Sequence, residues 1–566
     1  MMRMTGARAV LECLKREGVD VVFGYPGGAI LPLYEEMYKD NFRHILTGHE
    51  QGAVHAADGY ARVTGRPGVC IATSGPGICN MVTGIATANM DSIPMVIISG
   101  QVPTNLIGRD SFQEADISGI TSPITKHNYL VKNAASIPRV LKEAFYIAST
   151  GRPGPVLIDI AKDALEAEIN FEYPDKVNLP GYVVETSGQA YDIDRAVAMI
   201  QQSQKPVFLV GGGVILSETT QFLKDIVETT EIPVVTTLMG KGALPDSHPL
   251  HLGMGGMHGA YASNKAISGC DLLIALGARF DERLTSRADT FAPNAQIIHF
   301  EIDDVEIDKI IDIDLGVKGD LRWSLPIFAQ KLKEGSFDYE TAFSEWRQHV
   351  LTLKKDHPFA TPPRPGCISP QSIFAAVRAI TRDDDTVAIT DVGQHQMWAA
   401  QFFTTDEPKH FITSGGLGTM GFGLPAAAGA KVACPDKTVV LFSGDGSILM
   451  NCQEFATLSQ YDIDVKVIVL HNDTLGMIVQ LQDFFYDQHY SQCRLNKKKD
   501  LPMLAESMGV KGYHIEKQDE LIPILTEAFA HQGPALIDIR ISKDERVYPT
   551  VPGGKALSDM ILGGDA

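Results

Sequence analysis

The sequence of 566 residues lacks the marks of several protein classes. No apolar run reaches the roughly 18 residues that a membrane-spanning helix needs. Basic residues are in deficit, with 49 Lys and Arg against 69 Asp and Glu, and the resulting net charge of −20 argues against a nucleic-acid or anionic-membrane partner. The eight cysteines include no Cys-x-x-Cys pair and no metal-type spacing, so we expect reduced thiols.

The first residues also lack a targeting pattern. The segment 1–20 enters an amphipathic helical pattern almost at once, and it is neither a signal peptide nor an Arg- and Ser-rich transit sequence. We therefore expect a cytoplasmic protein without membrane partners.

What the chain does contain is a regular alternation of short β-branched runs and helical patterns, typical of a doubly wound parallel α/β fold. Its length predicts about three domains, and a weakly patterned stretch (171–187) and a Pro-rich one (354–370) separate three series of runs. The runs are 19–23, 68–72, 95–99 and 155–160; 206–210, 232–237, 272–276 and 297–302; 386–390, 439–442, 465–470 and 535–541. We predict three doubly wound α/β domains at about 1–180, 190–345 and 365–566. No short internal repeat is expected, although the first and third domains share a rhythm.

The stretch 441–485 carries two polar side chains after two successive predicted strands. Asp445 lies between Gly444 and Gly446, and Asn472 follows the next strand, 27 residues later. Carboxyl ends of parallel strands share the ligand-binding edge of a sheet, and two oxygen ligands there can hold Mg²⁺, with phosphate and water completing its shell. A helix predicted to begin at Ser447 would offer free N–H groups to an anion. Asp-Gly alone is usually a surface turn, but with Asn at this spacing the stretch resembles the thiamine diphosphate signature.

A glutamate in the first predicted domain acquires meaning from that signature. Glu50 follows a short strand, where a lone glutamate is usually solvated. A thiamine cofactor, however, needs a carboxylate at N1′ of its aminopyrimidine, and a desolvated Glu with a raised pKa suits such proton exchange.

Eight motifs, in order, extend the likeness along nearly the whole chain. They are Gly-Tyr-Pro-Gly-Gly-Ala-Ile (24–30), His-Glu-Gln-Gly-Ala (49–53), Asp-Ser-Phe-Gln-Glu-Ala-Asp (110–116), Thr-Lys-His-Asn (125–128), Gly-Arg-Pro-Gly-Pro (151–155), Arg-Phe-Asp-Glu-Arg (279–283), Asp-Val-Gly-Gln-His-Gln-Met-Trp (391–398) and Ser-Gly-Gly-Leu-Gly-Thr-Met-Gly-Phe-Gly (414–423). Together they resemble the catalytic subunit of the acetohydroxyacid synthase (acetolactate synthase) family.

The resemblance implies an enzyme that decarboxylates pyruvate on thiamine diphosphate and joins the hydroxyethyl fragment to a second 2-ketoacid, pyruvate or 2-ketobutyrate. The products would be 2-acetolactate or 2-aceto-2-hydroxybutyrate, for branched-chain amino acid biosynthesis. It also implies Mg²⁺ and FAD, a homodimer or homotetramer, and compatibility with a small regulatory subunit. In the family, the glutamate and the metal motif of one site come from different protomers. The alternatives are a pyruvate oxidase or simple 2-ketoacid decarboxylase on the same scaffold, and a non-catalytic flavin- or nucleotide-binding protein.

By the same resemblance, residues receive roles. The catalytic set would be Glu50, Gly28, Gln113, Lys162 and Arg283, the metal ligands Asp445, Asn472 and Thr474, and the substrate-pocket residues Phe112 and Leu481. Thiamine diphosphate would contact Val392, Gly393, Gln394, His395, Gly418, Met420, Gly446, Ser447, Gly476 and Met477. FAD would contact Leu238, Met239, His258, Gly277, Arg279, Glu301 and Asp320.

Three of these assignments carry open alternatives or departures. Arg283 would bind the second substrate's carboxylate in a bidentate fork, or else form a surface ion pair with Asp281 or Glu282. The run Gly211, Gly212 and Gly213 follows a predicted strand without completing Gly-x-Gly-x-x-Gly, so as a dinucleotide motif it is weak; the family's FAD domain gives the better interpretation. Leu481 stands where the family usually has Trp, and losing that ring face predicts a weaker preference for 2-ketobutyrate.

Overall fold

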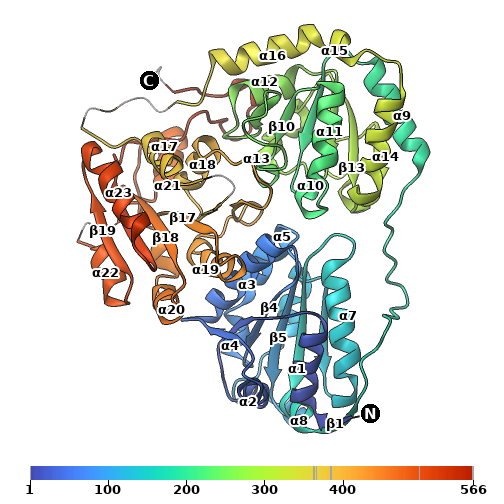
Figure 1. Cartoon of the computed structure of the whole chain (residues 1–566), viewed down its shortest axis with the longest axis vertical. Coiled ribbons are helices and arrows are strands. Elements are labelled where there is room, and N and C mark those ends of the chain that lie inside the picture. Colours follow the sequence, from blue (N-terminus) through green and yellow to red (C-terminus); the bar gives the residue numbers. More distant parts are fainter. Residues whose placement is uncertain (1, 361–363, 365, 383–384, 496–497, 564–566) are drawn as a thin grey trace.

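Three α/β domains follow one another along the chain in a computed structural model that describes residues 2–360, 364, 366–382, 385–495 and 498–563. In Figure 1 the N-terminal domain lies at the bottom, the middle domain at the upper right and the C-terminal domain at the left. Each is built on a six-stranded sheet whose paired strands are all parallel. The predicted fold class is confirmed, while the domain limits of 1–180, 190–345 and 365–566 stay predictions.

The N-terminal sheet has the order β3-β2-β4-β5-β7-β6, and the short strands β1 and β8 pair separately. Its main elements are β1 (Met2–Thr5), α1 (Gly6–Arg16), β2 (Val22–Gly24), α2 (Leu31–Asp40), β3 (His44–Leu46), α3 (Glu50–Thr64), β4 (Gly68–Ala72), α4 (Pro76–Cys79), α5 (Val82–Met90), β5 (Met95–Gln101), α6 (Ile117–Thr121), β6 (His127–Val131), α7 (Ile137–Ser149), β7 (Pro155–Ala161), α8 (Lys162–Glu166) and β8 (Glu168–Phe171).

The middle sheet has the order β11-β10-β9-β12-β13-β14, in which the chain winds outward first to one side of β9 and then to the other. Its elements are α9 (Ala190–Gln202), β9 (Pro206–Val210), α10 (Gly213–Leu216), α11 (Thr220–Thr230), β10 (Val234–Thr236), β11 (His251–Met254), α12 (Tyr261–Gly269), β12 (Leu272–Leu276), α13 (Glu282–Thr285), β13 (Gln296–Glu301), β14 (Leu315–Lys318), α14 (Leu321–Glu334), α15 (Tyr339–Ala342) and α16 (Ser344–Asp356).

The C-terminal sheet has the order β16-β15-β17-β18-β20-β19, the same winding as the N-terminal sheet. Its elements are α17 (Pro370–Ile380), β15 (Thr386–Thr390), α18 (Gln394–Phe402), β16 (Phe411–Ile412), α19 (Gly423–Ala433), β17 (Thr438–Gly444), α20 (Glu454–Gln460), β18 (Val465–His471), α21 (Gly476–Phe485), α22 (Leu501–Ser507), β19 (Lys511–Ile515), α23 (Leu521–Ala530) and β20 (Ala535–Arg540).

Apolar residues on both faces of each sheet explain why helices cover both sides. In β4, Val69 and Ile71 join one buried cluster, whereas Cys70 and Ala72 join another. The second cluster continues into the C-terminal domain, because α3 packs directly on α19. Small residues permit this close packing: a Cβ on Gly59 would lie 2.1 Å from the carbonyl oxygen of Ala426. The N- and C-terminal domains therefore share one continuous core.

Two connecting stretches agree with the predicted weakly patterned regions. No helix or strand of the described chain falls between β8 and α9, and this segment runs as an extended trace along the right side of Figure 1. The Pro-rich stretch follows α16, although residues 361–363 and 365 lie outside the described residues.

The prediction that a helix begins at Ser447 is wrong. A short 3₁₀ turn, Ile448–Met450, follows instead, and α20 begins only at Glu454. The Ser447 hydroxyl donates a hydrogen bond to the carbonyl oxygen of Val392 (2.8 Å). A three-residue turn does not align the N–H groups that an α-helix would direct at an anion, so other groups must serve that purpose.

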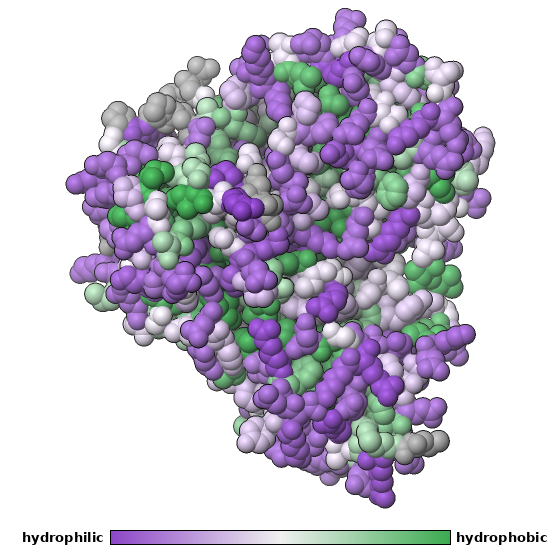
Figure 2. Space-filling model, viewed as in Figure 1, coloured by the Kyte–Doolittle hydropathy of each residue, from purple (hydrophilic) through white to green (hydrophobic). Residues whose placement is uncertain are grey.

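Hydrophilic residues cover most of the face in Figure 2, and apolar surface comes into view where the N-terminal domain meets the other two. Among the described residues, every helix is too short or too polar to cross a bilayer.

Candidate active site

Two loops meet at the topological switch point of the C-terminal sheet. After β15 the chain turns to the edge strand β16, and after β17 it proceeds in the other direction, so the loops following β15 and β17 diverge from neighbouring strand ends. This is the place where open α/β sheets bind ligands. The first loop carries Val392, Gly393 and the start of α18, and the second carries Asp445 and Gly446.

His395 links the two loops. The residue is 4% exposed, and a Cβ on Gly444 would lie 2.9 Å from its Nδ1. Burial lowers the pKa of His395 to about 3, so the ring is neutral. Its Nε2 has no hydrogen-bond partner among the described residues. A buried polar atom without a partner is costly, so His395 is suited to a polar ligand.

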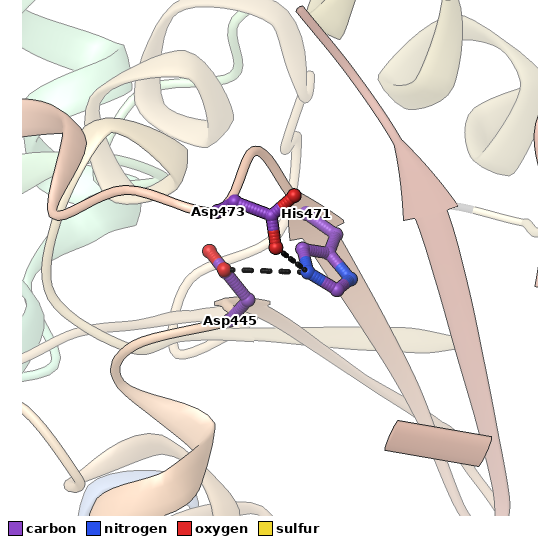
Figure 3. Close-up of side chains that lie close together, drawn as sticks. All are labelled: Asp445, His471 and Asp473. Carbon is purple, nitrogen blue, oxygen red and sulfur yellow. Dashed lines mark hydrogen bonds and ion pairs between the residues drawn. The ribbon is translucent and has the colours of Figure 1, made fainter. Parts of the chain in front are cut away.

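Asp445 belongs to a polar cluster with His471 and Asp473, drawn in Figure 3, and of these three it alone lines the cavity described below. Its Oδ2 atom is 3.4 Å from His471 Nε2 and 2.8 Å from Lys499 Nζ. His471 Nε2 is also 3.0 Å from Asp473 Oδ1, while its Nδ1 is 2.7 Å from Asp538 Oδ1. Burial raises the pKa of Asp445, with His471 and Lys499 opposing the shift.

The neighbouring carboxylate behaves in the opposite way. Burial alone would raise the pKa of Asp473, but hydrogen bonds from Lys499 and His471 hold it down to about 2. The ammonium of Lys499 lies between the two carboxylates, 2.8 Å from Asp445 and 3.1 Å from Asp473. The cluster thus already places one cation beside Asp445.

Asn472 and Thr474 occupy the loop after β18, beside the Asp445 loop. The backbone N–H and hydroxyl of Thr474 donate to Asn472 Oδ1, at 3.1 and 2.9 Å. The side-chain amide of Asn472 donates to Gln394 Oε1 (3.3 Å). A Cβ on Gly476 would come within 1.8 Å of that same Gln394 atom, so a larger residue at the start of α21 would displace the Gln394 side chain, which begins α18.

One cavity of about 1040 Å³ brings most of the predicted residues together. From the C-terminal domain it is lined by Val392, Gly393, Gln394, His395, Gly418, Met420, Asp445, Gly446, Ser447, Asn472, Thr474, Gly476, Met477 and Leu481. From the middle domain it is lined by Gly212, Gly213, Leu238, Met239, His258, Gly277, Arg279, Arg283, Glu301 and Asp320. The volume is at the upper end of ordinary ligand sites.

The middle-domain residues also gather at a switch point, here between β9 and β12. Gly211 is not part of the cavity lining; instead, its Cβ would meet the carbonyl oxygen of Gly277 at 2.1 Å. The glycine run therefore lets the two loops approach each other. His258 is buried, which lowers its pKa to about 4, and its Nδ1 lies 3.3 Å from the carbonyl oxygen of Pro549.

Arg283 does not form the ion pair that was the alternative to substrate binding. Among the described residues its side chain contacts Met257 Sδ (3.0 Å), and no ion pair with Asp281 or Glu282 is present. The carboxylate of Asp281 instead accepts the backbone N–H of Arg283 (2.9 Å), which caps α13.

The N-terminal set lies apart from this cavity. Gly28, Glu50, Phe112, Gln113 and Lys162 are absent from its lining. Glu50 begins α3 and accepts a hydrogen bond from the side-chain amide of Asn80 (2.9 Å). The backbone of Gln113 packs on Gly75, where a Cβ would come within 2.6 Å. Phe112 beside it is 87% exposed.

Several residues near the cavity were missed from the sequence. Arg62 and Asp91 line it from the N-terminal domain, although both belong to a buried ion-pair network. Phe484 and Phe485 also line it. Their spacing of three and four residues from Leu481 on a helix could have identified them, whereas nothing local marks Arg62 or Asp91.

Comparisons with known proteins agree along the whole chain. Residues 4–120, 193–328 and 391–539 match the thiamine pyrophosphate enzyme N-terminal TPP binding, central and C-terminal TPP binding domains. An acetolactate synthase of Mycobacterium bovis is 46% identical over 567 residues, covering 99% of this chain and 92% of the relative. The acetolactate synthase large subunit of Corynebacterium glutamicum is 46% identical (99% and 90% covered). A probable acetolactate synthase large subunit of Methanocaldococcus jannaschii is 47% identical (99% and 95% covered).

Proposed function

The chain belongs to the acetolactate synthase family of thiamine pyrophosphate enzymes, and from this premise we propose a site assembled from two chains, with Mg²⁺ and FAD as further cofactors. Bound thiamine diphosphate supplies the carbon nucleophile and electron sink needed to decarboxylate pyruvate and join its two-carbon fragment to a second 2-ketoacid. The observation that carries the proposal is the gathering of the C-terminal and middle sets around one cavity.

The C-terminal switch point fits the diphosphate and its metal. Asp445, Asn472 and the backbone carbonyl of Thr474 offer hard oxygen ligands of the kind Mg²⁺ prefers. The buried Nε2 of His395, which has no partner among the described residues, would gain a polar partner from a ligand bound beside the two loops. Val392, Gly393, Gln394, Gly446 and Ser447 would surround the diphosphate, Gly418 and Met420 would contact the aminopyrimidine, and Gly476 and Met477 would complete the wall.

Glu50 would hold and release a proton at its carboxylate, from a second copy of the chain. Glu50 is absent from the cavity lining of its own chain, and apolar side chains that line the cavity are exposed, including Leu417 (43%), Ile478 (42%) and Phe485 (47%). A homodimer would cover that rim and bring Glu50 of one chain to the metal loops of the other; a homotetramer would repeat the unit.

The substrate residues would also come from both chains. Arg283 lines the cavity, and because its guanidinium has only the Met257 sulfur and no carboxylate as a side-chain partner among the described residues, it could bind the carboxylate of a substrate. Leu481 is 41% exposed at the same cavity. Phe112, Gln113, Lys162 and Gly28 would approach from the partner. Closing this space against water protects the two-carbon fragment from protonation, which would release acetaldehyde.

FAD would occupy the middle-domain part of the cavity. The close backbone approach at Gly211, Gly212, Gly213 and Gly277 suits an extended dinucleotide at a switch point. The other contacts would come from Leu238, Met239, His258, Arg279, Glu301 and Asp320.

The second substrate depends on the wall that Leu481 forms. Without a broad ring at this position, we expect pyruvate to compete more evenly with 2-ketobutyrate than in relatives with Trp there. Leu481→Trp should then shift the ratio of the two products toward 2-aceto-2-hydroxybutyrate by about tenfold, as expected for added apolar contact. Competition between equal concentrations of the two 2-ketoacids measures it, with Ile522→Trp, an exposed site on α23, as control. A strong preference of the parent enzyme for 2-ketobutyrate would contradict this role of Leu481.

Product analysis from pyruvate tests the function itself. With Mg²⁺ and thiamine diphosphate, with and without FAD, the expected main product is 2-acetolactate. Free acetaldehyde would instead support a simple decarboxylase, and acetate or peroxide would support a pyruvate oxidase. No turnover of pyruvate in any mixture would contradict the proposal.

A further inference from the structure

A loop between β16 and α19 carries the predicted aminopyrimidine contacts Gly418 and Met420. Its preceding part, residues 413–416, does not pack only against its own domain. It lies against the N-terminal domain of the same chain, at the ends of α3 and α5, and here two buried charged residues hold it.

Asp91 follows α5 directly and binds the loop backbone. Its Oδ1 accepts the N–H of Gly416 at 2.7 Å, and its Oδ2 accepts the N–H of Gly415 at 3.2 Å. The carboxylate is 0% exposed. Two adjacent N–H groups facing the two oxygens of one carboxylate fix both the position and the tilt of the loop.

Arg62, near the end of α3, completes the attachment. Its Nη2 donates to Asp91 Oδ2 (2.8 Å), and its Nη1 donates to the carbonyl oxygen of Thr413 (2.9 Å). Its Nε forms an ion pair with Asp58, one turn earlier on α3. The guanidinium also lies 5.2 Å from the ring centroid of Phe422, beyond Met420. One side chain thus contacts the protein on both sides of Gly418 and Met420.

Contacts around the loop leave little room for movement. A Cβ on Gly416 would lie 2.8 Å from Asp91 Oδ1 and 3.0 Å from Met90 Cβ, and one on Gly415 would lie 2.3 Å from Met239 Sδ. The hydroxyls of Thr87 and Thr419 are 2.7 Å apart. The loop is therefore clamped between all three domains just before it reaches the cavity.

We propose that Asp91, oriented by Arg62, is a positioning residue for the thiamine site of its own chain, because it fixes the loop that presents Gly418 and Met420. This rests on the proposed function. The N-terminal domain then serves two sites: its Glu50 goes to the partner's site, while its Asp91 shapes the site of its own chain.

Asp91→Asn tests the proposal most directly. The amide nitrogen would face donors in either orientation, those of Arg62 and Gly415 in place of Oδ2 or that of Gly416 in place of Oδ1, so the loop should shift. A displacement of about 1 Å can cost two orders of magnitude where groups must be aligned. We expect the Kd for thiamine diphosphate, measured by calorimetry with Mg²⁺ and without substrate, to rise at least about tenfold, and raised cofactor to recover part of kcat.

Asp58→Asn is the matched control, because it removes the other buried carboxylate paired with Arg62 without touching the loop. A merely structural role would lower the melting temperature of both variants and leave the Kd for thiamine diphosphate alike. We expect the Kd of Asp58→Asn to stay within threefold of the parent. Equal Kd values for Asp91→Asn, Asp58→Asn and the parent would overturn the proposal.

Gly416→Ala keeps every charge and disturbs the same contact from the loop side, so it replaces Asp91→Asn if that variant does not fold. It should raise the Kd in the same direction, and an unchanged Kd would count against the proposal. Failure of the proposed function has a different signature, since the parent itself would then bind no thiamine diphosphate or form no 2-acetolactate.

Discussion

The N- and C-terminal sheets repeat one design with different chemistry. Their strand orders are the same, and β7 and β20 share a short repeat, Gly-Pro-Val-Leu-Ile-Asp-Ile-Ala (154–161) and Gly-Pro-Ala-Leu-Ile-Asp-Ile-Arg (533–540). This likeness is contrary to the expectation that the chain has no short internal repeat. It was overlooked because it spans only eight residues, about the length of one strand. Cross-strand register places Ala72, Ser99 and Asp159 in one row, and Ser443, Val469 and Asp538 in the corresponding row.

Two residues beyond each row, the side chains of the two domains differ. Asp445 of the C-terminal domain corresponds to Ser74, and His471 corresponds to Gln101. In the N-terminal sheet, Asp159 accepts hydrogen bonds from the neutral Ser99 and Gln101, at 2.6 and 2.8 Å. In the C-terminal sheet, the equivalent Asp538 faces His471 at 2.7 Å. The two sheets thus share one scaffold and differ in a few side chains at the strand ends, and only the C-terminal sheet carries the residues of the proposed Mg²⁺ site.

Asp445→Ser, which copies the N-terminal sheet, should have the largest effect. It removes the carboxylate ligand, so we expect kcat to fall about 10³-fold, as when a main electrostatic group is lost from a site, and Mg²⁺-dependent binding of thiamine diphosphate to disappear. Initial rates of 2-acetolactate formation measure it. Asp436→Ser, at an exposed turn before β17, is the control. Near-parental rates in Asp445→Ser would show that this carboxylate is not what distinguishes the C-terminal sheet from the N-terminal one.

Glu50→Gln tests the contribution of the N-terminal domain. Loss of a proton-exchanging carboxylate should lower kcat about 10²- to 10³-fold, while the Kd for thiamine diphosphate stays within about threefold, because the proposed diphosphate and metal contacts lie on the other sheet. Stopped assays and calorimetry check the two values, with exposed Glu35→Gln as control. A rate equal to the parent's would mean that Glu50 has no such role.

His471→Gln gives the C-terminal sheet the amide of its counterpart. A partner behind a metal ligand is worth about 10- to 100-fold in metal affinity, and we expect the lower end: a roughly tenfold higher Mg²⁺ concentration for half-maximal activity. His514→Gln is a matched control, since His514 contacts the same Asp538 (3.1 Å) from the far side and is 43% exposed. Identical Mg²⁺ curves for both variants would contradict the expectation.

Asp159→Asn should have the smallest effect, visible only through pH. Burial raises the pKa of Asp159 to about 6, with hydrogen bonds from Ser99 and Gln101 opposing the shift, against about 3.9 when unfolded. The folded state therefore holds the proton more tightly, and this stabilisation is complete below about pH 4 and is lost as pH rises through 6.

The asparagine lacks this dependence. Between pH 5 and pH 7, the free energy of unfolding of Asp159→Asn relative to that of the parent should rise by about 1 kcal/mol, and its relative melting temperature should rise with it. Thermal unfolding at both pH values measures the change, with the exposed Asp175→Asn as control. A pH-independent difference between variant and parent would show that Asp159 does not titrate in this range.

Sequence patterns predicted the interior of each sheet and left most of its edges unrecognised. All twelve predicted runs overlap interior strands, four in each of the three sheets. Of the edge strands, only β3 was expected, as the short strand before Glu50, whereas β6, β11, β14, β16 and β19 were not predicted. Interior strands of parallel sheets are covered on both faces and read as continuous apolar runs. An edge strand such as β6, with exposed His127 and Leu130, gives no such signal.

The site was predictable where motif and strand end coincide. Asp445 and Asn472 follow adjacent strands, so their proximity followed from topology. The prediction of a helix from Ser447 failed, because a 3₁₀ turn followed by a separate helix gives an apolar pattern similar to that of one longer helix. Asp91 and Arg62 were missed because the contacts of Asp91 to Gly415 and Gly416, and of Arg62 to Thr413, span more than 320 residues of sequence, and no local pattern encodes them. The roles of the individual residues stay predictions.

Helix α3 carries Glu50 at its first turn and Arg62 in its last, about 18 Å apart along the axis at 1.5 Å per residue. In the proposed dimer, Glu50 at one end of α3 serves the partner's site, whereas Arg62 at the other end acts through Asp91 on the site of its own chain. Substitutions of Glu50 and Asp91 should therefore combine differently on one chain than on two. With Glu50→Gln and Asp91→Asn on opposite chains of a hybrid dimer, one site keeps both wild-type contributions. With both changes on one chain and none on the other, each site carries one defect. Hybrid dimers of identical composition should therefore differ in activity by a cis–trans rule, with the trans arrangement the more active.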